Sequence, residues 1–519
     1  MSRKSRITVT AASFLLTAAL VSFSFAQTAG GKLCKSASGC GCTATNPAPM
    51  RDITTMQLVK DMGLGINLGN TFEAACDWDD ANCWMADYDT PELAWQSVPI
   101  TRDIIKGYKA AGFNTVRVPV AWSHRMTGNA LAAGQTNGTY TIRPAVMDRV
   151  QEVVDWILEE EMYVILNIHW DGGWWDKFPS DSAECMRKYQ RIWTQVGERF
   201  KDYDDRLLFA SLNEEGGWDD VWYIWRNGSD LTAKARAYGI LNAINQAFVD
   251  LIRSQGGNNA GRHLQVQGYQ TNIDRTADEM FKMPTDVSNR LAVSVHYYDP
   301  FAFTHISEPV DWGGIINPMT TWGTDADYKE LNDFMDKMKV GFIDKGIPVI
   351  MGEYGVASWD ATFLRERESV RKYTLAVTKA MLDRNMLPVL WDVQLDAGKG
   401  EHIYYYDRHS ASFPDAEMAA GFRKLADEGS ASIGERTVSA RPALSRPSIT
   451  VKGRTLNIST SSSADLHVRM IDIKGRVRAT FSISGGSGTY STGKVPAGRY
   501  FIDIGGAGVS KTTAAVILK

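Results

Sequence analysis

Short apolar runs recur along the middle of the chain, and amphipathic segments separate them. The runs with the length of a buried strand are residues 62–69, 113–120, 162–168, 206–212, 263–269, 291–297, 347–353 and 386–392. Between most of them apolar residues recur at helical spacing, as in 145–160, 327–345 and 363–384. Purely apolar strands are typical of a parallel sheet that helices cover. The pattern therefore predicts eight βα units.

Eight such units over residues 56–430 predict a (β/α)8 barrel, in which the active site lies at the carboxyl ends of the strands. An open doubly wound sheet is the alternative. That fold would normally carry a Gly-rich phosphate loop between the first strand and a helix. The segment GLGINLGNT at 63–71 has the glycines, but no helical pattern follows it directly. This favours the barrel.

The pattern changes near residue 447, after a loose segment at 431–446 that predicts a linker. Short alternating strands separated by glycine turns then predict a small β-sandwich over 447–519. From residue 441 onward the chain has 12 Lys and Arg against 3 Asp and Glu, although its overall net charge is −4. An acidic surface or a nucleic acid could bind such a tail. A solvated basic module is the simpler interpretation, and we expect no nucleic-acid partner.

Residues 1–26 have the pattern of a secretory signal peptide: basic residues, an apolar segment and small residues before the cleavage site. A retained membrane anchor is the alternative, but the polar chain that follows favours cleavage. Residues 27–55 are rich in Gly, Ser, Ala and Thr and predict a linker. We therefore expect a protein that is secreted or held at the outer cell surface. Export permits disulfides, and Cys76 and Cys83 are close enough in sequence to form one.

Aromatic residues are numerous, with 16 tryptophans and 19 tyrosines among 519 residues. A large core accounts for part of them, and surface tryptophan is typical of proteins that bind flat ligands such as sugar rings. Trp174, Trp175 and Trp218 lie beside Gly and Asp just after the third and fourth strands. We predict that these three are platforms on which sugars stack. Several platforms along an open cleft would suit an endo-acting enzyme on a long chain.

Polar residues of catalytic types lie at the ends of six of the eight strands. They are Arg117, His169, Asn213, Glu214, His296, Tyr298, Glu353 and, as an aromatic member, Trp391. A barrel brings all these strand ends to one face. Two glutamates on separate strands suggest glycoside hydrolysis, in which one carboxyl group is protonated and the other is ionised. Arg117 and Tyr298 would stabilise a charged Glu353, and Asn213 would hydrogen-bond the sugar 2-hydroxyl.

Glu215 and the two histidines His169 and His296 each allow a second interpretation. Glu215 directly follows Glu214, and we assign it to the turn rather than to catalysis. His169 and His296 could in principle form a metal pair. No carboxylate or cysteine lies at ligand spacing on their strands, so we predict no metal and no cofactor.

At these residues the chain resembles glycoside hydrolase family 5, which includes β-1,4-glucanases. The resemblance covers 56–430 and rests on the order and spacing of GINLGNT, RVPVAW, NIHW, LNE, VHYYDP, MGEYG and LPVLWD. It implies a retaining mechanism with Glu214 as acid/base and Glu353 as nucleophile. It also implies that the −1 subsite is lined by Arg117, His169, Asn213, His296, Tyr298 and Trp391, with Trp391 beneath the sugar ring.

Three positions depart from the family pattern. Glu215 stands where proline is usual, Trp170 where many members have a second histidine, and Val393 where asparagine is common. These changes leave the substrate open. We expect a monomeric, secreted, retaining endo-β-1,4-glucanase that acts on cellulose or related β-glucans. A mannanase, a xyloglucanase and a non-catalytic glycan-binding protein are the alternatives.

The tail also has a resemblance, carried by MIDIKGRV, GRYFIDI and the terminal KTTAAVILK. These segments resemble the C-terminal sorting domain of the type IX secretion pathway, which implies attachment to the cell surface. A plain β-sandwich appendage and a carbohydrate-binding module are the other interpretations of this domain.

Overall fold

The computed structural model describes residues 50–75, 91–128, 138–218, 231–357, 365–394, 403–434 and 448–518, the last with gaps at 453, 460–464, 473–475 and 507–508. The predicted signal peptide, most of both predicted linkers and the predicted Cys76–Cys83 pair lie outside these residues. No helix in the described ranges is long and apolar enough to cross a membrane.

Eight parallel strands close into a barrel in the order β1-β12-β11-β8-β7-β6-β5-β2. Their bounds are β1 Gly65–Asn67, β2 Thr115–Val118, β5 Tyr163–Asn167, β6 Leu207–Ala210, β7 Leu264–Gln267, β8 Leu291–Tyr297, β11 Val349–Tyr354 and β12 Leu387–Leu390. Nearly every residue of these strands is buried, as expected when helices cover a parallel sheet. The closed barrel confirms the (β/α)8 prediction and excludes the open sheet.

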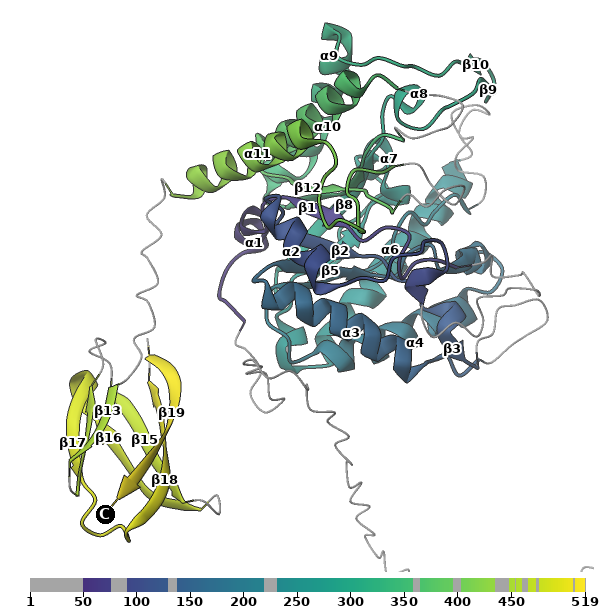
Figure 1. Cartoon of the computed structure of the whole chain (residues 1–519). Helices are drawn as coiled ribbons and strands as arrows, with labels where there is room; N and C mark the ends of the chain where they lie inside the picture. The colour runs from purple at the N-terminus through teal and green to yellow at the C-terminus, as the bar shows by residue number, and fades with distance from the viewer. Residues whose placement is uncertain are drawn as a thin grey trace, which may run out of the picture. The chain divides into compact units, whose positions relative to one another are not determined.

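Helices alternate with these strands and surround the sheet (Figure 1). Thr101 begins the first of them by accepting the N–H of Ile104, and Thr324 and Asp327 form a reciprocal capping box at another. The helices are α2 Arg102–Ala110, α3 Pro144–Glu159, α4 Ser182–Phe200, α6 Leu231–Ser254, α7 Ile273–Thr276, α8 Phe301–Thr304, α9 Asp325–Gly341, α10 Arg367–Leu382 and α11 Ala416–Gly434. Two short strand pairs lie in the loops: β3 Met126–Thr127 with β4 Thr141–Ile142, and β9 Val310–Asp311 with β10 Ile315–Ile316.

The amino-terminal end of the barrel is filled with apolar side chains. Leu58 and Met62 of α1 (Thr55–Met62) pack in one cluster with Ile165, Leu208 and Ile350 from the strands. The strand-end residues predicted for the site lie at the opposite, carboxyl end.

The barrel domain extends slightly beyond the predicted bounds of 56 and 430. Before α1, the Arg51 guanidinium donates from Nε to Asp205 Oδ2 at 2.6 Å and from Nη1 to Asp61 Oδ2 at 2.9 Å. The last residues of the predicted 27–55 linker therefore belong to the barrel. At the other end, α11 continues to Gly434.

The C-terminal region forms two antiparallel sheets, which confirms the predicted β-sandwich. One sheet has the order β13-β14-β17 and the other β16-β15-β18-β19. Leu456 and Ile458 from the first sheet share a core with Val468, Met470 and Ile502 from the second. The strands are β13 Ser448–Lys452, β14 Thr455–Ser459, β15 Leu466–Asp472, β16 Val477–Ile483, β17 Ser487–Ser491, β18 Gly498–Gly506 and β19 Val509–Leu518.

Candidate active site

A β-bulge in β11 sets the position of Glu353. The register of β11 against β8 shifts between Met351 and Glu353, and bulges of this kind re-aim side chains beside active sites. The residue within the bulge is Gly352, where a Cβ atom would lie 3.0 Å from Nε2 of His296. A larger residue at this position would therefore push His296 away. Glycine lets the side chains of Glu353 and His296 lie close together.

Two donors hold the carboxylate of Glu353, one on each oxygen. Arg117 Nη1 donates to Oε1 at 2.8 Å, and the Tyr298 hydroxyl donates to Oε2 at 3.0 Å. Arg117 is fully buried and only 7% of the Glu353 side chain is exposed. Charge-assisted hydrogen bonds in such a dry setting stabilise the ionised form of a carboxylate. Glu353 is thus held charged and oriented.

Arg117 also binds residues of β1 and of the segment just after β6. Its Nη1 donates to Asn67 Oδ1 and its Nη2 donates to Asn213 Oδ1, both at 2.8 Å. Asn67 in turn donates from Nδ2 to the carbonyl oxygens of Gly352, at 2.9 Å, and Leu390, at 3.1 Å. Asn67 is not among the residues predicted from the strand ends. Its signal was a polar residue at the end of the first strand, within the GINLGNT segment.

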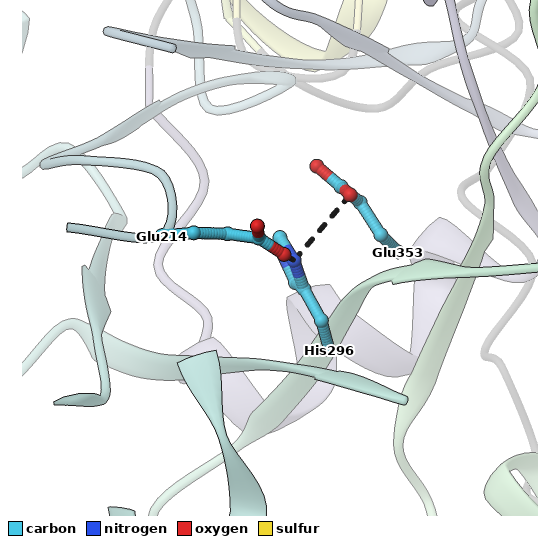
Figure 2. A group of neighbouring side chains, drawn as sticks. All are labelled: Glu214, His296 and Glu353. Carbon is cyan, nitrogen blue, oxygen red and sulfur yellow. Dashed lines mark hydrogen bonds and ion pairs between the residues drawn. The ribbon is translucent and has the colours of Figure 1, made fainter. Parts of the chain in front are cut away.

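Glu214 lies just after β6 and faces Glu353 across His296. Figure 2 shows the two carboxyl groups with the imidazole ring beside them. His296 Nδ1 lies 2.6 Å from Glu214 Oε1 and 3.4 Å from Glu353 Oε2. Ligand-type atoms of all three residues lie within 4.8 Å of one another. The structure therefore brings the two glutamates that were predicted from the strand ends to one place.

The surroundings of Glu214 favour its protonated form. Loss of hydration raises the pKa of its carboxyl group to about 7, and the charge of Arg117 opposes part of that rise. Because 48% of the side chain is exposed to solvent, water still reaches this group in the free protein. The full rise is expected when a bound sugar covers it. Burial lowers the pKa of His296 to about 4, so its ring is neutral at pH 7 and does not neutralise Glu214.

His169 and Trp391 form the neighbouring wall of the site. Their rings stack with centroids 5.5 Å apart and planes 6° apart. His169 Nδ1 lies 4.0 Å from Glu353 Oε1, and burial together with Arg117 lowers the pKa of His169 well below its ordinary value. With these two, the structure gathers all eight residues predicted from the strand ends at one end of the barrel.

Glu215 has a different place from Glu214. Its carboxyl Oε2 accepts the backbone N–H of Asn213 at 2.6 Å, and its own carbonyl oxygen accepts the N–H of Gln270 at 3.2 Å. The residue is buried, which raises the pKa of its carboxyl group to about 8. Glu215 therefore folds back onto the turn that carries Asn213 and Glu214, in line with its assignment to the turn.

The predicted sugar platforms Trp174, Trp175 and Trp218 are wrong, because all three are core residues. At most 3% of any of them is exposed. The rings of Trp174 and Trp175 stack with centroids 3.9 Å apart, and Phe178 packs against both, at 6.1 Å from Trp174 and 5.9 Å from Trp175. The indole of Trp218 packs against Phe178 and the ring of Tyr269. Protein rings thus occupy the faces that a sugar would need.

Backbone torsions explain this error. Gly172 and Gly173 have φ angles of +79° and +75°, in the left-handed region that favours glycine. They turn the chain, and Oδ2 of the buried Asp171 then accepts the indole N–H of Trp174 at 2.8 Å. Glycine and aspartate beside the tryptophans indicated an exposed loop, whereas here they build a buried turn.

The cluster of Glu214, His296 and Glu353 has ligand types that suit a cation. Each of its groups is already engaged, however: His296 Nδ1 with Glu214, and both oxygens of Glu353 with Arg117 and Tyr298. A cation placed there would also lie close to the guanidinium of Arg117, which repels it. The arrangement suits proton transfer better than metal binding, and the absence of a metal or cofactor stays a prediction.

A closed parallel barrel that brings two glutamates together at its carboxyl end, one held by Arg117 and Tyr298 and the other partly exposed, has the arrangement of a glycoside hydrolase. The family profile described as Cellulase (glycosyl hydrolase family 5) matches residues 74–396. The chain therefore belongs to glycosyl hydrolase family 5 and is an enzyme of that class.

Relatives with known names agree with this family. The chain is 35% identical over 390 residues to a xyloglucan-specific endo-β-1,4-glucanase of Bacteroides ovatus, covering 72% of this chain and 71% of that protein. It is 36% identical over 375 residues to endoglucanase A of Paenibacillus barcinonensis, covering 67% of this chain and 85% of that one. A solved broad-specificity endoglucanase from an uncultured bovine rumen ciliate is 36% identical, with a TM-score of 0.60, over 72% of this chain and 99% of its own.

Proposed function

We propose that the chain is a secreted endo-β-1,4-glucanase that retains anomeric configuration, with Glu353 as nucleophile and Glu214 as acid/base. The carrying observation is the separation of the two carboxyl groups, whose nearest oxygens lie within 4.8 Å. Retaining enzymes place these groups about 5–5.5 Å apart, whereas inverting enzymes need about 6.5–9.5 Å to admit a water molecule. The short separation supports direct attack by a carboxylate.

In the first step, an oxygen of Glu353 attacks the anomeric carbon while Glu214 gives its proton to the glycosidic oxygen. The bond between that oxygen and the anomeric carbon breaks, and the leaving sugar departs with a free hydroxyl group. In the second step, the Glu214 carboxylate removes a proton from water, and the resulting hydroxide displaces Glu353 from the anomeric carbon. Two inversions give net retention, and both glutamates return to their starting states.

The neighbouring side chains support these roles. Arg117 and Tyr298 fix the two oxygens of Glu353, so the attacking atom is oriented before substrate arrives. The Asn213 oxygen accepts from Arg117, which leaves its amide N–H₂ to donate to the sugar 2-hydroxyl. His169 and Trp391 would form the wall of the −1 subsite, with the indole as the flat surface beneath the ring.

The named relatives narrow the substrate class to β-glucans. One solved relative, the Bacteroides ovatus family 5 xyloglucanase, has a XXXG heptasaccharide bound; it is 33% identical to this chain, with a TM-score of 0.61, over 74% of this chain and 79% of that one. Other relatives are named as broad-specificity endoglucanase or lichenase. We propose β-1,4-linked glucans as substrates, with xyloglucan as the specific candidate that the Bacteroides ovatus relative favours.

A panel of four soluble polysaccharides tests this proposal: carboxymethyl-cellulose, mixed-linkage β-glucan, xyloglucan and mannan. We expect new reducing ends from at least one of the three glucans and few or none from mannan. Endo-action should lower the viscosity of the glucan well before much sugar is released. Preferred cleavage of mannan would contradict the substrate class, and binding without any new reducing ends would contradict catalysis.

The activity should decline on the basic side of about pH 7. Glu214 must carry a proton, so the active fraction is large below its pKa and falls as the pH rises through it. The pH profile of kcat, which reports the pKa values of the enzyme–substrate complex, measures this limb. The neutral histidines titrate too low to produce it. The matched control is Glu215→Gln, because burial raises the pKa of Glu215 to about 8; a limb that disappears in this variant would assign the limb to Glu215 instead.

We also propose export of the chain and attachment at the cell surface through the β-sandwich at 447–519. The support is the signal-like pattern of residues 1–26 and the resemblance of the tail to a sorting domain. A chain that ends at residue 446 should then appear in the culture medium of the producing cell rather than at its surface. The same distribution for both chains would contradict the attachment.

A further inference from the structure

A row of aromatic rings leads from Tyr298 to the protein surface. The Tyr298 ring meets His305 edge-on, with centroids 4.6 Å apart, and His305 stacks on Phe301 at 4.3 Å. Phe301 then contacts Trp312 at 5.6 Å. Exposure rises along the row, to 39% for Phe301 and 52% for Trp312. The row therefore begins at the residue that holds Glu353 and ends in an indole open to solvent.

The chain around Trp312 is built to hold that indole in place. Trp312 lies in the three-residue turn between β9 and β10, whose register pairs Asp311 with Ile315. Asp311 Oδ1 accepts the N–H groups of both Gly313 and Gly314 at 3.0 Å, and Gly313 has a φ of +92°. Such a turn is fixed by its own hydrogen bonds. The indole is thus presented on a preorganised support.

Two further hydrogen bonds tie this segment to the active site. The Thr304 hydroxyl at the end of α8 donates to the carbonyl oxygen of Tyr298 at 2.5 Å. The N–H of Met319, just after the hairpin, donates to the carbonyl oxygen of Ala302 at 2.9 Å. The hairpin and Tyr298 are therefore parts of one hydrogen-bonded segment, and a ligand on Trp312 has a defined position relative to the catalytic pair.

We propose that Trp312, backed by Phe301, is the platform of an outlying sugar-binding subsite for the β-glucan chain cleaved at Glu214 and Glu353. This inference rests on the proposed function. β-Linked glucosyl units carry their hydroxyl groups around the edge of the ring and apolar C–H groups on its faces. An exposed indole on a hydrogen-bonded turn, with Phe301 against it, fits such a face at low entropic cost to the protein. Buried Trp174, Trp175 and Trp218 cannot take this role.

The test compares long and short substrates in Trp312→Ala. We expect kcat/KM for cellohexaose or xyloglucan to fall by about tenfold, and kcat/KM for an aryl cellobioside to stay within about twofold, because the short substrate does not reach the outlying platform. Trp312→Phe, which keeps a flat ring, should restore most of the loss. The matched control is Ile315→Ala in the same hairpin, where Ile315 is 72% exposed. This variant should leave kcat/KM unchanged for both the long and the short substrate.

Three results would overturn the platform. These are no loss on long substrates, an equal loss on short ones, or the same loss in Ile315→Ala, which would indicate a general disturbance of the hairpin. Thermal unfolding of each variant checks that the barrel is intact. The activity of the unmodified enzyme separates the two proposals. If the enzyme cleaves glucans and Trp312→Ala does not change kcat/KM for long substrates, only the platform is contradicted. An enzyme that cleaves no glucan contradicts both.

Discussion

Glu353→Ala should lose hydrolysis of β-glucans almost completely, with kcat/KM reduced by about 10⁴-fold or more. The variant lacks the attacking oxygen, and it also leaves the buried Arg117 without the carboxylate to which it donates at 2.8 Å. Release of reducing ends from the best glucan of the panel measures the loss. Full activity in this variant would remove Glu353 from the mechanism.

An added nucleophile distinguishes loss of the nucleophile from a damaged site. In Glu353→Ala, azide can enter the space left by the carboxylate and attack an aryl β-cellobioside directly, which yields an α-glycosyl azide after one inversion. In Glu214→Ala, azide should instead intercept the glycosyl-enzyme and yield a β-glycosyl azide. NMR of the products gives the configuration. The opposite pair of products would exchange the two roles, and thermal unfolding shows whether each variant keeps its fold.

Most of the barrel could be predicted because its signal is repeated and simple. Each strand is covered on both faces, so its apolar run appears in the sequence, as in residues 162–168 and 347–353. Once eight such runs define a barrel, the position of every strand end follows from topology alone. Glu214 and Glu353, 139 residues apart in the chain, then meet without any prediction of loop structure.

The parts that could not be predicted depend on local backbone torsions. Whether Trp174 faces solvent or core is decided by Gly172 and Gly173 at positive φ, and an apolar pattern carries no such information. The opposite case is Trp312, whose exposure depends on a turn closed by Asp311. Asn67 was missed because one polar residue at the end of a buried strand is usually structural, and only its bonds to neighbouring strands show its place in the site.

Glu214 and Glu215, the two adjacent acids after β6, should respond very differently to substitution by glutamine. Glu214→Gln removes the proton that the leaving oxygen needs, so hydrolysis of natural glucans should fall by about 10²–10⁴-fold. An aryl glycoside with an acidic leaving group requires little help from an acid. Formation of the glycosyl-enzyme from that substrate should continue in Glu214→Gln, and a pre-steady-state burst of the phenol would record it.

Glu215→Gln should cost much less, by about tenfold at most, because the amide oxygen can still accept the N–H that Asn213 donates to Glu215 Oε2 at 2.6 Å. Glu215→Ala loses that acceptor and leaves a buried N–H unpaired, so it should be the more harmful change at this position. Its effect would act through the turn, lowering activity on natural and aryl substrates alike. Glu214→Gln alone should separate the two substrates. Equal losses on natural glucans in Glu214→Gln and Glu215→Gln would contradict the assignment, because of these two adjacent residues Glu215 is buried and Glu214 has an exposed side chain.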